Sequence, residues 1–277
     1  MATPRLASVR LRGADGGPLH VDIRTGARSG EVRPVVVICH GFKGFKDWGM
    51  FPVVAERLAL AGFTAVTFNF SGSGVGPASD VVDEPERWFR QTLSGDLADL
   101  ESVISHVLRD GPSWVGLVGH SRGGGVAILQ AAKDARVKAL VTWASVAGFQ
   151  RYSAEELARW RRDGRIEVVN ARTGQVLPIG LAALQDLERH SAGALDLLAA
   201  ANRVTAPWLI VHGSADESVP AEEAARLAHA SGSARTERLT VDGAGHTFGA
   251  RHPWAGSTAE LELVVAHTTR FLSSTLG

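Results

Sequence analysis

The chain of 277 residues carries 29 acidic and 29 basic side chains, so its formal net charge is zero. A balanced charge gives no field that would attract nucleic acid or an anionic membrane surface, and small-molecule chemistry is therefore favoured over either partner. Single α/β domains often reach this length, so one domain over residues 1–277 is expected.

The cysteine count and the hydropathy pattern indicate the cellular compartment in which the protein is expected. Cys39 is the only cysteine, which excludes an intrachain disulfide and fits a reducing environment. Residues 1–13 contain no continuous apolar stretch like that of a signal peptide, and eighteen apolar residues nowhere run together. We therefore expect a soluble, cytoplasmic protein. A homodimer is consistent with the sequence.

Strand and helix patterns alternate along most of the chain. Two short strands around the turn residues Asp15, Gly16 and Gly17 predict an antiparallel ribbon at a sheet edge. The predicted strands cover residues 8–12, 19–24, 34–39, 64–70, 114–118, 139–145, 208–212 and 236–241, and the predicted helices cover 52–61, 93–108, 124–133 and 259–272. Continuous apolar strands between helices indicate an α/β fold with a mostly parallel sheet covered on both faces.

Residues 149–204 interrupt this alternation, and we call them the insert. They contain a charged helical run at 154–162, two strand-like stretches at 166–170 and 175–177 around a turn, and a helical stretch at 181–200. No linker rich in proline, glycine or serine flanks the insert, so it is expected to be a small cap on the same domain.

The pentapeptide Gly119-His120-Ser121-Arg122-Gly123 lies between a predicted strand and a predicted helix. This is the setting of a nucleophile elbow, where a tight turn exposes a serine hydroxyl beside a base and beneath backbone donors. Flanking glycines remove Cβ atoms where the strained turn crosses its neighbours. The pattern predicts Ser121 as a nucleophile.

An oxyanion hole needs the backbone N–H that follows the nucleophile and a second N–H from the loop after an earlier strand. Arg122 and Phe42 occupy those places, because the glycine-containing loop at 40–44 directly follows a predicted strand. Another glycine-rich loop, at 71–76, invites a phosphate-binding interpretation, which is disfavoured because no Gly-Lys-Ser/Thr ending follows it.

The acid and the base of such a site follow the nucleophile in the chain. Asp216 lies in the loop after the strand at 208–212 and is favoured as the acid over its neighbour Glu217. His246 lies in a loop just past the last predicted strand and is favoured as the base over His252. The histidines at 40, 120 and 212 are expected to be buried hydrogen-bonding residues, and those at 20, 106, 190, 229 and 267 have no motif context.

Four motifs in order, at residues 40–44, 119–124, 213–216 and 245–246, resemble those of the α/β-hydrolase superfamily. Within it, residues 40–48 and the position of the insert are similar to bacterial serine esterases and to the hydrolase domains of acylaminoacyl peptidases and cinnamoyl esterases. The resemblance implies an eight-stranded sheet whose second strand is antiparallel. It also implies a triad of Ser121, Asp216 and His246, with Phe42 and Arg122 as oxyanion donors.

These roles predict a serine esterase that cleaves small to medium carboxylic esters through an acyl-enzyme, with no metal or organic cofactor. An aminopeptidase or amidase with the same triad and a non-catalytic binding relative are the alternatives. The chain lacks the large amino-terminal propeller of the oligopeptidases, which disfavours peptide hydrolysis. Core packing is the default role of large apolar side chains, but five are candidates for substrate contacts: Phe45, Trp48, Tyr152, Trp160 and Leu181.

Overall fold

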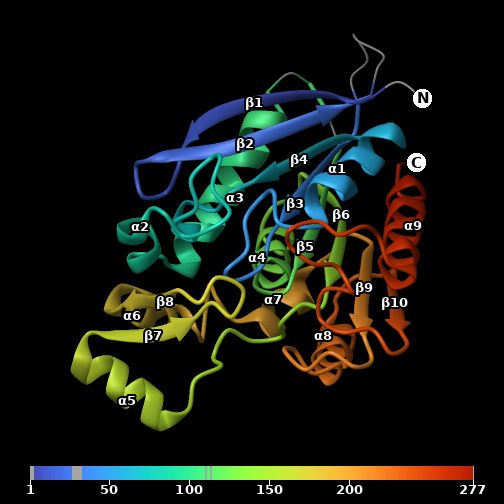
Figure 1. Cartoon of the computed structure of the whole chain (residues 1–277). Coiled ribbons are helices and arrows are strands. Elements are labelled where there is room, and N and C mark those ends of the chain that lie inside the picture. The colour runs from blue at the N-terminus through green and yellow to red at the C-terminus, as the bar shows by residue number, and fades with distance from the viewer. Residues whose placement is uncertain (1–2, 27–32, 110, 113, 277) are drawn as a thin grey trace.

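An eight-stranded sheet forms the centre of the computed structural model, which describes residues 3–26, 33–109, 111–112 and 114–276 (Figure 1). The strands of this sheet are β1 Arg5–Arg12, β2 Pro18–Thr25, β3 Val35–Cys39, β4 Thr64–Phe68, β5 Val115–His120, β6 Val137–Trp143, β9 Trp208–Gly213 and β10 Thr236–Val241. Their order across the sheet is β1-β2-β4-β3-β5-β6-β9-β10. Strand β2 is antiparallel to both of its neighbours and the other pairs are parallel, which confirms the predicted fold class.

Helices cover both faces of the sheet (Figure 1). The helices are α1 Phe51–Leu60, α2 Pro85–Phe89, α3 Leu93–Val107, α4 Arg122–Ala131, α5 Ala154–Asp163, α6 Leu181–His190, α7 Leu197–Arg203, α8 Glu222–Ala230 and α9 Ala259–Ser273, with a 3₁₀ turn η1 at Ser71–Ser73. Sequence periodicity did not predict the short α2 or η1, because one turn is too short to show a period. Within the described residues, no helix has the length and apolar character needed to cross a membrane.

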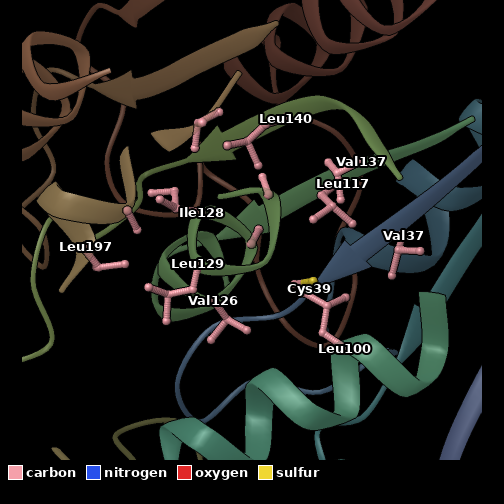
Figure 2. Close-up of a cluster of buried hydrophobic side chains, with 14 of the residues drawn as sticks. Val37, Cys39, Leu100, Leu117, Val126, Ile128, Leu129, Val137, Leu140 and Leu197 are labelled. Atoms are coloured by element: carbon pink, nitrogen blue, oxygen red, sulfur yellow. The ribbon is translucent and has the colours of Figure 1, made fainter. Parts of the chain in front are cut away.

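The sheet separates two apolar layers because successive strand residues face opposite sides. In β3, Val35, Val37 and Cys39 pack into a layer with α3, α4, α7 and α8. Val36 and Ile38 pack into the opposite layer with α1 and α9. Figure 2 shows part of the first layer, where side chains of β3, β5, α3 and α4 meet. Each such side chain, once fully buried, contributes about 1.5–3 kcal/mol, so these layers fix the sheet on which the loops are mounted.

The insert carries its own two-stranded antiparallel sheet, formed by β7 Arg165–Val169 and β8 Val176–Gly180, which confirms the predicted hairpin. The helix predicted over 181–200 is wrong as one element, because the chain leaves the helix after α6 and restarts at α7. Asp196 caps the new start, and its side chain accepts a hydrogen bond from the amide of Ala199 at 3.0 Å. Because of the break, Leu184 of α6 and Leu197 of α7 pack into different apolar clusters.

Candidate active site

Ser121 lies at the sharp turn between β5 and α4. Its backbone has φ 56° and ψ −122°, a conformation rare for a residue with a side chain, and such strain is typical of functional sites. A Cβ atom on Gly123 would lie 2.3 Å from the carbonyl oxygen of His40, and one on Gly119 would lie 2.5 Å from the carbonyl oxygen of Gly123. The two glycines of the motif are therefore required by close backbone packing.

Asp216 and His246 meet at the same edge of the sheet, in the loops after β9 and β10. The Nδ1 atom of His246 lies 2.8 Å from Oδ2 of Asp216. Because a carboxylate only accepts hydrogen bonds, this contact places the imidazole proton on Nδ1 and leaves Nε2 able to accept. Asp216 is the carboxylate that contacts the histidine, whereas Glu217 is exposed.

Several donors stabilise the ionised form of Asp216. Its Oδ1 accepts hydrogen bonds from the amides of Ser218 and Val219, both at 2.9 Å. Nε2 of His212 lies 3.3 Å from its Oδ2. Burial acts to raise the pKa of Asp216, but the hydrogen bonds from His212, His246 and Val219 outweigh it and hold that pKa well below its usual range. Asp216 is therefore a carboxylate at neutral pH.

Two buried histidines hold the loops of the site. Nε2 of His120 donates to the carbonyl oxygen of His246 at 3.0 Å and so fixes the loop that carries the candidate base. Nε2 of His40 accepts from the amide of Phe70 at 3.1 Å, and its Nδ1 donates to the carbonyl oxygen of Gly41 at 2.9 Å. Burial lowers the pKa of His40 to about 4 and that of His120 to about 3, so both are neutral at pH 7. Their predicted role as buried hydrogen-bonding residues is confirmed.

The two predicted oxyanion donors flank Ser121. Arg122 is the first residue of α4, so its N–H has no acceptor within the helix and lies at the positive end of the helix dipole. The loop of Phe42 passes against the elbow, since a Cβ on Gly41 would lie 3.0 Å from the Cβ of Ser121. The guanidinium of Arg122 stacks over the Phe42 ring, 5.5 Å from its centroid.

The side chain of Arg122 is anchored away from the turn by Gln91 and Asp96. Its two terminal nitrogens donate to Oε1 of Gln91 and Oδ2 of Asp96, each at 2.6 Å. Burial raises the pKa of Asp96 to about 6, although the ion pair with Arg122 acts in the opposite direction. No sequence pattern predicts this anchor, because Gln91 and Asp96 come from the turn before α3 and from its first turn, far from Arg122 in the chain.

The raised pKa of Asp96 predicts a specific pH dependence of stability. Between about pH 4 and pH 6 the folded chain holds a proton that the unfolded chain releases, so this contribution to stability is lost as pH rises. We expect the free energy of unfolding of the native protein, minus that of Asp96→Asn, to fall from about pH 4 to pH 7. Urea titrations at a series of pH values measure this difference, and a flat or rising difference would contradict the expectation.

A cavity of about 570 Å³ opens over the elbow, within the usual size range of small-molecule sites. Ser121, His246, Phe42 and Arg122 line it. Of the five predicted substrate-contacting residues, Trp48, Tyr152 and Trp160 line the cavity, whereas Phe45 and Leu181 do not.

The two exceptions have a physical reason. Phe45 is 1% exposed, packs its ring edge-on against His252 at 5.0 Å, and lies in the apolar cluster that joins its loop to the insert. Leu181, the first residue of α6, packs against the same apolar cluster. Ala183 and Leu187 of the same helix face the cavity instead, an orientation that sequence periodicity alone does not assign.

The insert supplies cavity residues that the sequence analysis did not single out. They come from its entry segment, its hairpin and α6: Phe149, Arg151, Asn170, Ala171, Arg172, Ile179, Ala183 and Leu187. Lys43 also lines the cavity, from the loop after β3. Only the tertiary path of the insert brings these residues over Ser121.

The glycine-rich loop at 71–76 has several of its backbone donors occupied. The amide of Ser71 donates to Oδ2 of Asp99 at 2.7 Å, and the amide of Gly76 donates to Oδ1 of Asp83 at 2.8 Å. Asp99 and Asp83 would also repel an anion at this loop. The loop therefore has a structural role, and the phosphate-binding interpretation is not supported.

The fold is shared with solved hydrolases. The structure of the DcsB complex with its substrate analogue is 22% identical with a TM-score of 0.75, and the match covers 98% of this chain and 100% of that one. Est1E from Butyrivibrio proteoclasticus with bound ferulic acid is 21% identical with a TM-score of 0.71, covering 97% and 99%. An uncomplexed acylaminoacyl peptidase from Pyrococcus horikoshii is 20% identical with a TM-score of 0.69, covering 100% of this chain and 42% of the peptidase. With the observed sheet, these likenesses show that the chain has the α/β-hydrolase fold.

The family is narrower than the fold. Residues 30–179, more than half of the chain, match the family model described as serine aminopeptidase, S33, and the chain belongs to this family. Two curated relatives from Escherichia coli, each an uncharacterized 31.7 kDa protein in the traX-finO intergenic region, are 32% and 31% identical over 112 residues. Each match spans 39% of this chain and only 36% of the relative.

Proposed function

We propose that this hydrolase cleaves carboxylic esters by nucleophilic catalysis at Ser121, with His246 as the base and Asp216 as the acid of a catalytic triad. The observation that carries the proposal is the 2.8 Å contact between His246 and Asp216 at the cavity that also contains the strained Ser121. These groups come from the carboxyl ends of β5, β9 and β10, where α/β sheets place their reacting groups.

The roles give a complete reaction. The hydroxyl oxygen of Ser121 attacks the ester carbonyl carbon while Nε2 of His246 accepts the hydroxyl proton. Asp216 stabilises the resulting imidazolium through Nδ1, and the amides of Phe42 and Arg122 donate to the developing oxyanion. The imidazolium then protonates the leaving alcohol as the carbon–oxygen bond breaks. Water, activated by the same histidine, attacks the acyl-serine and releases the acid.

The charge of the cavity wall favours esters over substrates with a free amino group. Four cationic side chains line the cavity, and in the described part of the chain no aspartate or glutamate does. An aminopeptidase must bind the ammonium group of its substrate, for which a carboxylate is the usual partner. Cleavage of an aminoacyl amide, which the family description favours, is the second candidate.

We also propose that the insert acts as a cap over Ser121. Its residues Tyr152, Trp160 and Leu187 line the cavity together with Phe42 and its loop. A closed cap excludes water from the acyl-enzyme until the alcohol has left, and it selects substrates by shape. The same cap supplies ten of the residues that line the cavity.

Paired substrates distinguish the two candidates. We expect the purified protein to hydrolyse p-nitrophenyl esters of short acids, and to cleave aminoacyl p-nitroanilides at least about a hundredfold more slowly, because the cavity offers no anionic group to bind the ammonium. Release of nitrophenol and nitroaniline is followed by absorbance. Faster cleavage of the anilides would replace the ester assignment with the aminopeptidase, and inactivity on both would overturn the proposal.

A further inference from the structure

The cavity wall carries more positive than negative charge. Its cationic side chains are Lys43, Arg122, Arg151 and Arg172. The carboxylates paired with these cations, Asp96, Glu223 and Asp80, do not line the cavity, so they affect its charge through the cations that they neutralise. The balance of these pairs decides whether the wall attracts an anion.

Each of the three arginines has a carboxylate partner. Ion pairs join Arg122 to Asp96 at 2.6 Å, Arg151 to Glu223 at 2.7 Å and Arg172 to Asp80 at 3.6 Å. Arg151 also donates to the carbonyl oxygen of Ser218 at 3.0 Å. A guanidinium already paired in this way adds little net field to the cavity.

Lys43 differs from the arginines. Its ammonium donates to the carbonyl oxygen of Val169, 3.2 Å away on β7, and lies 5.7 Å from the centroid of the Phe42 ring. Over residues 3–26, 33–109, 111–112 and 114–276, no carboxylate forms an ion pair with it. An ammonium has three donor hydrogens, so two remain available at the cavity wall.

We propose, on the basis of the ester hydrolase function above, that the substrate is an ester carrying a second, anionic group such as a carboxylate, and that Lys43 binds this group. Lys43 directly follows Phe42, so an anion at its ammonium is held beside the oxyanion loop while the ester carbonyl is at Ser121. Phe42 contributes the apolar surface between the two points. Neutral esters lack the second point of attachment and bind in more orientations.

A structural role for Lys43 makes a different prediction. If its bond to Val169 serves only to hold the insert against the core, its loss affects all substrates equally. If it binds an anion, its loss affects anionic substrates selectively. The comparison of charged and neutral esters in one variant therefore separates the two roles.

Two matched pairs of esters test the proposal. p-Nitrophenyl hemiadipate and p-nitrophenyl hexanoate differ in a carboxylate or a methyl at the end of the acyl chain. Hexanoyl esters of 4-hydroxybenzoate and 4-hydroxybenzamide differ in a carboxylate or a neutral carboxamide on the alcohol side. We expect the native protein to prefer the anionic ester in at least one pair, and Lys43→Gln to lower the ratio of kcat/KM, anionic over neutral, by about tenfold in that pair.

Control variants separate the loss of one positive charge from the loss of the contact between Lys43 and the substrate anion. Lys138→Gln removes one positive charge from a lysine that also donates to a backbone carbonyl, that of Ala135 at 2.8 Å, but lies outside the cavity lining, and its ratio should equal that of the native protein. Lys43→Arg keeps the positive charge, so it should retain the preference for the anionic ester. Added salt should weaken that preference. A ratio unaffected by Lys43→Gln in both pairs, or an equal loss on both members of a pair, overturns the proposal. Absence of hydrolysis of all four esters rejects the ester hydrolase function and this inference with it.

Discussion

Substitution of Ser121 by alanine is expected to lower kcat for p-nitrophenyl esters by a factor of about 10⁵ or more. The variant loses the only atom of the proposed mechanism that bonds to the acyl group, and the oxyanion donors cannot replace it. Alanine keeps the Cβ atom and the backbone of the turn, so the α4 helix and the glycine contacts around it are retained. Ester hydrolysis at saturating substrate measures the effect.

Ser145→Ala is the matched control for that loss. Ser145 is buried near the elbow, donates to the carbonyl oxygen of Val146 at 3.1 Å and does not line the cavity. This variant should keep kcat within a few-fold of the native value. Full activity of Ser121→Ala would remove the nucleophile from the proposal, and equal losses in the two variants would indicate a folding defect.

Substitution of His246 by alanine is expected to produce a loss of similar size, because the serine hydroxyl then has no base to accept its proton. Asp216 cannot substitute, since its Oδ1 is committed to two backbone amides and its pKa is held low. The loss should appear in kcat at every pH at which the protein is folded. Steady-state kinetics between about pH 6 and pH 9 measure it, on either side of the ordinary pKa of histidine.

His252 provides the comparison in the same loop region. Its Nδ1 accepts a hydrogen bond from the amide of Gly49 at 2.9 Å, and its ring stacks on Trp48. His252→Ala should therefore cost stability, about 1–3 kcal/mol for the unpaired amide, and keep most of the activity. The reverse pattern, with His252→Ala inactive and His246→Ala active, would transfer the role of the base.

The fold was predictable from sequence because its determinants are local or periodic. The apolar runs of β3, β5 and β9 and the stripes of α3 and α9 each follow from residues a few positions apart. The placement of Ser121, Asp216 and His246 at one edge follows in turn, since loops after parallel strands gather there. Asp216 and His246, which the order of the motifs favoured as acid and base, do contact each other in the structure.

The cavity wall was less predictable for a physical reason. Arg151 and Arg172 of the insert and Lys43 of the loop after β3 line one cavity only because of how the insert packs on the loop of Phe42. Such packing depends on contacts between distant residues, which leave no period in either segment. Phe45 shows the opposite case, because its position in the motif suggested a substrate contact while its ring is buried in the apolar cluster shared with the insert.

Labelling with a fluorophosphonate tests the central claim most directly, because this reagent bonds only to a serine activated by its surroundings. Intact-mass and peptide mass spectrometry should show a single adduct per chain, on Ser121. The adduct should be absent from Ser121→Ala and should form far more slowly in His246→Ala. An adduct on another residue, or no adduct on the folded, active protein, would contradict the account.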